Sequence, residues 1–327
     1  MASTGAAIAV DDGSALRGIA FLTVGISMFS IMDVLIKTLS ATYPAHEIVF
    51  FRGLVALLPI LLIVQYEGGL RLLRTRRPVA HVVRGLFGFV TYMAFYLALT
   101  ALPLAETVTL FYASPLFVTA LAFPVLGELV GLRRWIAVLV GFAGVVVVTR
   151  PGMTAIEPAM LLAVGSAATY AIMIMMTRRL SVTEAGSTLA FYSMSTFIVA
   201  SVVVGLAVGD GRFDTVDHPS AAFLLRAWSV PGFTDSLMLA ACGLIAGAGF
   251  YCLSQAYRSA SVSVVAPFEY TSLPWAILWG YVFFGDLPGA TTLLGLALIV
   301  GSGFYIIHRE TVKGRRLVRG KPMRPRI

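Results

Sequence analysis

Four charged side chains lie within long apolar runs of the sequence, where ionisable groups are rare. Asp33 and Lys37 occupy the first run, and Arg52 occupies the second. Glu269 lies near the middle of the ninth run. A charged side chain at the centre of a bilayer costs about 2.5–3.5 kcal/mol on insertion scales. We therefore expect all four to face the interior of a helical bundle, where each is a candidate for substrate binding or ion coupling.

The spacing of these charges suggests how they act. Asp33 and Lys37 are four residues apart, so they share one face of a helix. They either form an ion pair that allows insertion or open to bind a charged or zwitterionic substrate. Arg52 cannot readily lose its proton, so its expected partner is a substrate carboxylate, a phosphate or Asp33. A buried carboxyl such as Glu269 is able to bind a proton and a cationic substrate in alternation.

Aromatic residues accompany Glu269 in the ninth run. Tyr270 follows it directly, and Trp275 and Trp279 share a helix face at a spacing of four residues. Aromatic walls stack on ring-shaped substrates or hold cations, although tryptophan is also common in plain packing and at the lipid interface. Further tyrosines of the same kind within apolar runs are Tyr92, Tyr96, Tyr112 and Tyr170. We take these aromatic residues as candidates for the walls of a substrate site.

Three other charged residues within the runs have simple structural explanations beside a functional one. Glu47 lies near one end of the second run, where we expect it only to contact water. Arg84 lies one turn into the third run, so its head group is able to reach the interface. Glu106 opens the fourth run, where a carboxylate favours a helix N-terminus. For Arg84 and Glu106 the structural interpretation is preferred.

Prolines interrupt two of the runs. Pro115 lies in the fourth run, and Pro267 and Pro274 lie in the ninth. A proline inside a membrane helix frees backbone carbonyls, which neighbouring groups must satisfy or which line a cavity. The three prolines therefore mark either hinges or static kinks.

Composition places the whole chain in a bilayer. Of its 327 residues, 58% are hydrophobic and 12% are charged, whereas a soluble domain carries about 25% charged residues. Crossing the hydrocarbon layer takes about 20 apolar residues. The sequence has ten such runs, which are 16–39, 45–66, 80–101, 104–126, 134–149, 158–177, 186–208, 236–257, 261–284 and 290–308. The prediction is an all-α integral membrane protein of ten transmembrane helices.

The distribution of basic residues orients these spans. Arginines and lysines gather in the loops of one side and in the C-terminal tail, while the other side holds only Arg150, Arg212 and Arg226. By the positive-inside rule, both termini then face the cytoplasm of a bacterium, at its inner membrane. Residues 1–15 are expected to form a flexible tail, and residues 309–327 a basic tail. Because the positive charge sits between apolar runs, binding to nucleic acid is excluded.

The chain also repeats itself at an offset of 158 residues. The offset superimposes Ala98 on Ala256, Tyr112 on Tyr270, Ser114 on Ser272, Gly127 on Gly285 and Glu128 on Asp286. Five spans separate the copies, and an odd number forces opposite orientations. The prediction is two five-helix halves of inverted topology, residues 16–150 and 151–308. Many carriers share this plan, with the substrate site near the membrane midplane between the halves.

These residues carry a resemblance to a known family. The first half contains Pro103-Leu-Ala-Glu-Thr, Ser114-Pro-Leu-Phe, Leu126-Gly-Glu, Arg133-Arg-Trp, Val140-Gly-Phe-Ala-Gly and Arg150-Pro-Gly. The second half contains Ala266-Pro-Phe-Glu-Tyr, Phe284-Gly-Asp and the glycines from Gly295 to Gly303. In this order the motifs resemble the two EamA repeats of the drug/metabolite transporter superfamily. The resemblance implies a ten-helix carrier with a central cavity, driven by gradients or exchange without ATP hydrolysis.

Two early segments resemble one branch of that family. They are Ala45-His-Glu-Ile-Val-Phe-Phe-Arg and Arg77-Pro-Val-Ala-His-Val-Val-Arg-Gly, and they are most similar to the S-adenosylmethionine-type branch. The family also includes riboflavin and aromatic amino-acid carriers, which remain alternatives. The resemblance implies a small-molecule substrate, a coupling ion such as a proton, and a monomer or homodimer in the lipid bilayer.

Other classes of function fit the sequence less well. A membrane-embedded enzyme is disfavoured because the chain has no P-loop, HExxH or GxSxG motif. Its four histidines have no metal-ligand spacing, so neither a metal nor a cofactor is expected. A scaffold would not need charges inside its spans, and a channel has less use for an inverted repeat. The leading hypothesis is therefore a secondary active transporter that works by alternating access.

Overall fold

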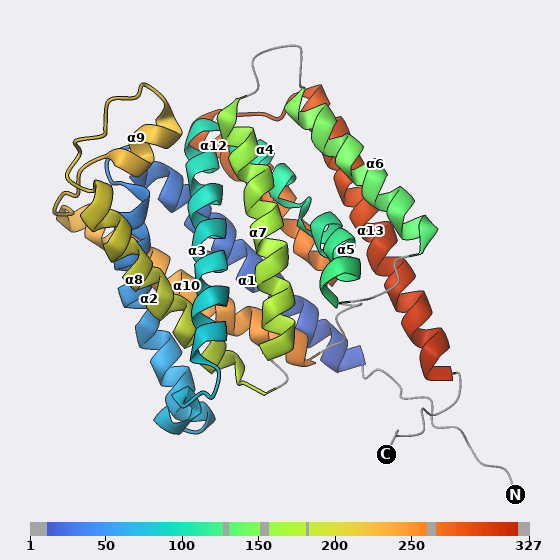
Figure 1. The fold of residues 1–327 in the computed structure, drawn as a ribbon. Helices are drawn as coiled ribbons and strands as arrows, with labels where there is room; N and C mark the ends of the chain where they lie inside the picture. Colours follow the sequence, from blue (N-terminus) through green and yellow to red (C-terminus); the bar gives the residue numbers. More distant parts are fainter. Residues whose placement is uncertain (1–11, 127–130, 151–156, 181–182, 260–265, 320–327) are drawn as a thin grey trace, which may run out of the picture.

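The computed structural model describes residues 12–126, 131–150, 157–180, 183–259 and 266–319, and these residues form helices and loops (Figure 1). The first half contains α1 (Asp12–Leu39), α2 (Ala45–Glu67), η1 (Leu70–Leu73), α3 (Pro78–Ala101), α4 (Leu104–Phe111), α5 (Ser114–Leu126) and α6 (Leu132–Thr149). The second contains α7 (Pro158–Leu180), α8 (Gly186–Val208), α9 (Pro219–Leu225), α10 (Phe233–Ser259), η2 (Ala266–Thr271), α12 (Ser272–Phe284) and α13 (Ala290–Arg319).

Within the described ranges, nine segments are long and apolar enough to span a membrane. The fourth of them, Leu104–Leu121, joins α4 to α5. The remaining expected span, residues 261–284, does not qualify, because its described part is divided between η2 and the 13-residue α12. The chain is thus an all-α multi-pass membrane protein, and two of its ten expected spans, 104–126 and 261–284, are divided into shorter helical segments.

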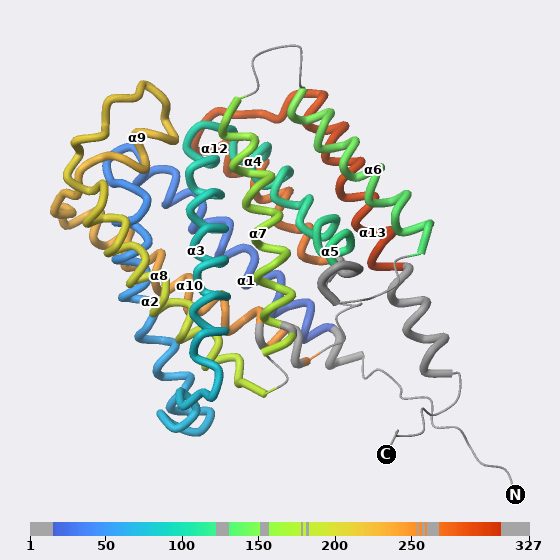
Figure 2. Tube along the Cα trace, viewed as in Figure 1, coloured from blue at the N-terminus to red at the C-terminus, as the bar shows by residue number. Residues whose placement is uncertain are grey.

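The packing of the helices follows a two-fold arrangement that relates the halves. Helix α1 packs mainly on α10, and its counterpart α7 packs mainly on α3. Helices α2 and α8, which occupy equivalent places, pack on each other at one edge of the bundle. Helices α6 and α13 do the same at the opposite edge, where they lie side by side and run in opposite directions (Figure 1, Figure 2). The inverted-topology repeat expected from the 158-residue offset is therefore present in three dimensions.

Both halves contain a helix that is interrupted at the same place. In the first, α4 ends at Phe111 and α5 begins at Ser114. In the second, η2 ends at Thr271 and α12 begins at Ser272, which is Ser114 shifted by 158. The first break has a direct cause, because Pro115 has no N–H to donate to the Phe111 carbonyl four residues earlier.

The other two prolines lie near the second break. Pro267 lies within η2, and Pro274 lies in the first turn of α12, where proline is tolerated. The three prolines thus mark the positions at which the two helices change course. Their action as hinges during a transport cycle stays a prediction.

The loops divide between two ends of the bundle, which we call upper and lower from their places in Figure 1. Loops 40–44, 102–103, 209–232 and 285–289 lie at the upper end, and loop 68–77 lies at the lower end with the start of α1 and the end of α13. The long loop 209–232 folds over the upper end. Trp228 packs against Gly205 and Gly209 there, where a larger side chain would overlap its ring.

Close helix contact fixes the position of α2 beside α10. A side chain at Gly243 would overlap Val55 and the Arg52 carbonyl, and a side chain at Gly247 would overlap Pro59. Small residues allow membrane helices to approach in this way. The contact places Arg52 in the middle of the bundle.

Candidate functional site

Arg52 is the centre of a buried polar cluster. Its side chain is 2% exposed, and its Nη1 donates a hydrogen bond of 2.5 Å to the hydroxyl of Tyr96 on α3. The same nitrogen lies 3.7 Å from Met32 Sδ on α1. The guanidinium carbon lies 5.5 Å from the ring centres of both Tyr92 and Tyr96, within the range of a cation–π contact. Three helices therefore meet at one permanent positive charge.

Asp33 lies beside this charge on α1 and is half-buried. Arg52 is the cation whose charge acts on its carboxylate, and Asp33 in turn acts on Tyr92, Tyr96 and Tyr112. Among the described residues, no ion pair within 4.0 Å involves Asp33. Asp33 and Arg52 thus lie close enough for their charges to interact, but they do not form an ion pair.

Lys37 points to a different place from Asp33. Its Nζ donates a 2.7 Å hydrogen bond to the Leu102 carbonyl and lies 3.9 Å from Asp286 Oδ2. It also lies 4.9 Å from the ring centre of Phe284. The ion pair between Asp33 and Lys37 that was one interpretation of the sequence is not formed. Instead, Lys37 ties α1 to the turn between α12 and α13 at the upper end.

Glu269 lies in η2, where the two broken helices meet. The hydroxyl of Tyr112 donates a 2.6 Å hydrogen bond to the backbone carbonyl of Glu269 and lies 2.7 Å from Ser272 Oγ. The Glu269 carboxylate acts electrostatically on Tyr112, Tyr170 and Tyr270. The rings of Tyr112 and Tyr270 lie 4.9 Å apart. The backbone of Glu269 therefore forms part of a hydrogen-bonded contact between the halves, beside the rings of Tyr112 and Tyr270.

The tyrosines connect the two charged positions. Tyr92 and Tyr170 each contact the aromatic neighbours of the cluster, and the charge on Asp33 reaches Tyr112 of the broken helix. Tyr92, Tyr112 and Tyr170 are half-buried, whereas Tyr96 is 1% exposed. The structure thus brings together most of the residues expected to bind substrate, and it places them on α1, α2, α3, α4, α7 and η2.

Trp275 and Trp279 lie along a helix contact. Their rings stack 5.5 Å apart at an angle of 14°, and Trp279 Nε1 donates a 3.1 Å hydrogen bond to Ser30 Oγ on α1. Trp275 packs against the small apolar group of Leu22 and Ile26. These contacts agree with the packing interpretation of the pair, and a role in substrate binding stays a prediction.

Arg84 forms a second buried arginine site near the lower end. Its side chain is 4% exposed. Its Nη2 donates hydrogen bonds of 2.5 Å to the Leu189 carbonyl and 2.8 Å to Ser193 Oγ on α8, and its Nη1 lies 3.5 Å from Thr177 Oγ1 on α7. The expectation that Arg84 reaches the membrane interface is wrong, because its partners are backbone and hydroxyl oxygens of neighbouring helices.

Two further acidic residues form contacts at the upper end of the bundle. Glu47 has no exposed surface, and its Oε2 accepts a 3.3 Å hydrogen bond from the Ser229 N–H of the upper loop. Glu106 Oε1 accepts a 2.8 Å hydrogen bond from Thr292 Oγ1. The expectation that Glu47 only contacts water is therefore wrong, since the upper loop covers it.

Sequence reasoning did not single out several residues that contact this site. Met32 and Ser272 touch Arg52 and Tyr112 respectively. Away from this cluster, His81 is fully buried with its ring 4.5 Å from that of Tyr192. Only Ser272 had a signal, as a member of the 158-residue offset. The contacts of Met32 and His81 depend on tertiary packing, which no local pattern reveals.

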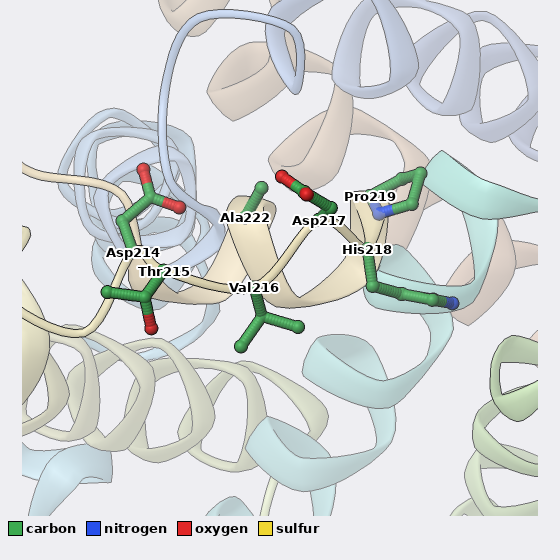
Figure 3. Close-up of a pocket in the computed structure, with 7 residues that line it drawn as sticks. All are labelled: Asp214, Thr215, Val216, Asp217, His218, Pro219 and Ala222. Atoms are coloured by element: carbon green, nitrogen blue, oxygen red, sulfur yellow. The ribbon is translucent and has the colours of Figure 1, made fainter.

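A hollow of about 500 Å³ lies on the upper loop. It is lined by Asp214, Thr215, Val216, Asp217, His218, Pro219 and Ala222, and Figure 3 shows Asp214 and His218 at opposite ends of this set. His218 Nε2 pairs with Glu157 Oε1 at 2.7 Å. In the part of the chain that the structure describes, no three acidic, histidine or cysteine residues could hold a metal ion. The hollow is therefore assigned no ligand.

Comparisons with known proteins agree with this architecture. The model of the EamA-like transporter family matches residues 16–150 and again residues 157–307. An S-adenosylmethionine uptake transporter of Rickettsia prowazekii (strain Madrid E) is 26% identical over 295 residues, which are 90% of this chain and 94% of that protein. A riboflavin transporter of Vibrio cholerae is 29% identical over 299 residues, again 90% and 94% of the two chains.

Two further matches are an exporter and a solved structure. A pseudopaline exporter of Pseudomonas aeruginosa (strain UCBPP-PA14) is 28% identical over 278 residues, which are 83% of this chain and 89% of that protein. A solved crystal structure superimposes with a TM-score of 0.60 at 20% identity and covers 93% of this chain and 98% of its own, which supports the fold. Because the family model matches both halves, the chain belongs to the EamA-like transporter family and is a multi-pass protein of the bacterial inner membrane.

Proposed function

We propose that this protein carries a small zwitterionic or aromatic metabolite across the membrane by alternating access, with Arg52, Asp33 and Glu269 as its charged contacts. The observation that supports this most is the buried Arg52, which faces a carboxylate that it does not touch. Such an uncompensated arrangement costs free energy inside a membrane. A ligand that bridges the two charges would recover it.

The chemistry of the cluster suggests the class of substrate. The guanidinium of Arg52 fits a carboxylate, and Asp33 or Glu269 fits a cationic group. The faces of Tyr92, Tyr96 and Tyr170 suit a planar ring. A molecule that combines these groups has the features of S-adenosylmethionine, the substrate in the name of several relatives. Riboflavin, named for other relatives, has the ring but no cationic group and is the alternative.

The remaining features of the proposal concern orientation and coupling. The positive-inside distribution supports an orientation with the lower end and both termini in the cytoplasm. Residues 16–150 and 151–308 act as the two halves that rock against each other around the central cluster. Glu269, at the contact between the halves, is the candidate for proton coupling, and exchange of substrate across the membrane is the alternative. The protein acts as a monomer or homodimer.

A counterflow measurement in sealed proteoliposomes tests this proposal. Vesicles loaded with unlabelled S-adenosylmethionine should accumulate labelled S-adenosylmethionine without ATP, and parallel vesicles should test riboflavin and aromatic amino acids. Replacement of Glu269 by Gln should abolish counterflow or its response to pH, because the side chain loses its charge and keeps its shape. Glu157→Gln, the same change near the upper surface, is the matched control. Full transport by Glu269→Gln would refute the role of this residue, and strict dependence on ATP would refute the carrier class.

A further inference from the structure

Two tyrosines that occupy equivalent places in the halves have different surroundings. Tyr112 and Tyr270 are related by the 158-residue offset, and their rings touch at 4.9 Å. The hydroxyl of Tyr112 forms two hydrogen bonds to the opposite half. The hydroxyl of Tyr270 is buried and has no hydrogen-bond partner among the described residues. A two-fold arrangement is therefore broken at its centre by one pair of hydroxyl groups.

The bonds of Tyr112 define what its counterpart lacks. A phenol has one hydrogen to donate, which Tyr112 gives to the Glu269 carbonyl, so Ser272 Oγ donates to the Tyr112 oxygen. Both partners belong to the break in the second half. The equivalent atoms in the first half are the Phe111 carbonyl and Ser114 Oγ, by the same offset of 158.

In the first half, these two groups lie at the break between α4 and α5. Pro115 cannot donate to the Phe111 carbonyl, because it has no N–H. The amides that close the break, those of Ala113 and Leu116, bond to the carbonyls of Leu110 and Ala113 instead. Ser114 is buried at the start of α5. The Phe111 carbonyl, which receives no bond from Pro115, and the Ser114 hydroxyl are thus the groups that correspond to the two partners of Tyr112.

Resting on the proposed alternating access, we infer that Tyr112 and Tyr270 exchange roles during transport, each bonding the opposite break in one of the two end states. In an inverted repeat, the two halves are able to exchange conformations when the access changes sides. In the state seen here, Tyr112 holds the second half and the Tyr270 hydroxyl rests against Gly303 of α13. In the opposite state, Tyr270 bonds Phe111 and Ser114, and Tyr112 is released.

In each of the two states, one of the two tyrosine hydroxyls is hydrogen-bonded and the other hydroxyl has no partner. An unsatisfied buried hydroxyl costs free energy, so neither state gains over the other from this pair. Two states of similar free energy are what alternating access requires. The hydroxyls act as positioning groups for the halves, and substrate contact is not needed for this role.

Removal of one oxygen atom from each ring tests the exchange. Tyr112→Phe removes bonds that exist only in the present state, and Tyr270→Phe removes bonds that exist only in the opposite state. Spin labels at Thr42 and Leu287 flank the contact of Lys37 with Asp286, and both positions are exposed. Distances between the labels in lipid nanodiscs, with Cys242 and Cys252 replaced by Ala, report the ratio of the two states.

The two substitutions should shift this ratio in opposite directions, each by about fivefold, as expected for hydrogen bonds of ordinary strength. Ser272→Ala should act like Tyr112→Phe, and Ser114→Ala like Tyr270→Phe, which provides a second matched pair if a tyrosine variant fails to fold. Shifts in the same direction, or no shift, would overturn the exchange. Opposite shifts in a protein that fails every counterflow test would support the exchange and reject the proposed transport.

Discussion

Two buried arginines, Arg52 and Arg84, sit in transmembrane helices and have different kinds of partner. Arg84 donates to a backbone carbonyl and to hydroxyls of α7 and α8. Arg52 meets a phenol, a thioether and two aromatic faces, and the carboxylate nearest to it is not in direct contact. Different contacts thus offset the free-energy cost of placing each charge inside the membrane.

The difference teaches how to separate structural from functional charges inside a membrane. Arg84 uses oxygens that are fixed in the backbone and in short side chains, so its site joins three helices and has little left to offer a ligand. Arg52 faces groups that interact weakly with a guanidinium, so a substrate anion would compete with them easily. The identity of the partners, more than burial, is therefore the reason why we propose Arg52, and not Arg84, as the binding residue.

The largest expected effect is at Arg52. Arg52→Gln should lower counterflow by about hundredfold or more, because the loss of one member of a desolvated charge pair costs about 2–5 kcal/mol. The Arg52→Gln variant should insert into the membrane and elute from size exclusion as the wild-type protein does. Arg84→Gln is the matched control. Equal losses of transport per folded molecule in the two variants would break the distinction between the arginines.

A smaller effect is expected at Asp33. Asp33→Asn keeps the shape of the side chain and removes the charge, so a cationic substrate should bind about tenfold more weakly, in line with about 1.5–3 kcal/mol for a charge-assisted hydrogen bond. The concentration dependence of counterflow measures this change. If riboflavin is the substrate, Asp33→Asn should not weaken its binding. An unchanged concentration dependence with S-adenosylmethionine would show that Asp33 does not contact the substrate.

The smallest effect on transport is expected at Arg84, where stability should change instead. Arg84→Gln should lower the free energy of unfolding by about 2 kcal/mol, because three hydrogen bonds between membrane helices are weakened. Transport per folded molecule should stay within about twofold. Thermal unfolding in detergent, followed by size exclusion, measures the first quantity. An unchanged midpoint of thermal unfolding would show that the hydrogen bonds of Arg84 do not stabilise the bundle.

Much of the fold was predictable because a bilayer allows few kinds of spanning structure. Apolar length gave the spans, and the offset that pairs Tyr112 with Tyr270 gave the inverted halves. Pro267 and Pro274 indicated an interruption in the span containing Glu269, and its described part is divided at Ser272. Apolar composition alone does not report where such a break lies or which kind of helix each part forms.

The candidate site was predictable in its residue types and only partly in its partners. Arg52 was expected to meet an anion, and the structure sets Asp33 near it. The partners of Lys37 were not predictable, because Leu102 and Asp286 come from distant parts of the chain. Spacing along a helix shows which residues share a face, but a long side chain bonds to whatever the neighbouring helices bring within reach.

The sequence by itself determined the solvent of this protein, the spans that cross it and the opposed halves, since each follows from hydrophobicity, charge placement and chain order. Only the tertiary structure decided how each charge inside the membrane is satisfied. It separated Asp33 from Lys37, joined Arg84 to α8, and gave Tyr112 bonds that Tyr270 lacks. The reason is that a buried polar group must find its partner in three dimensions, and the contacts that supply it are made between segments far apart in the chain.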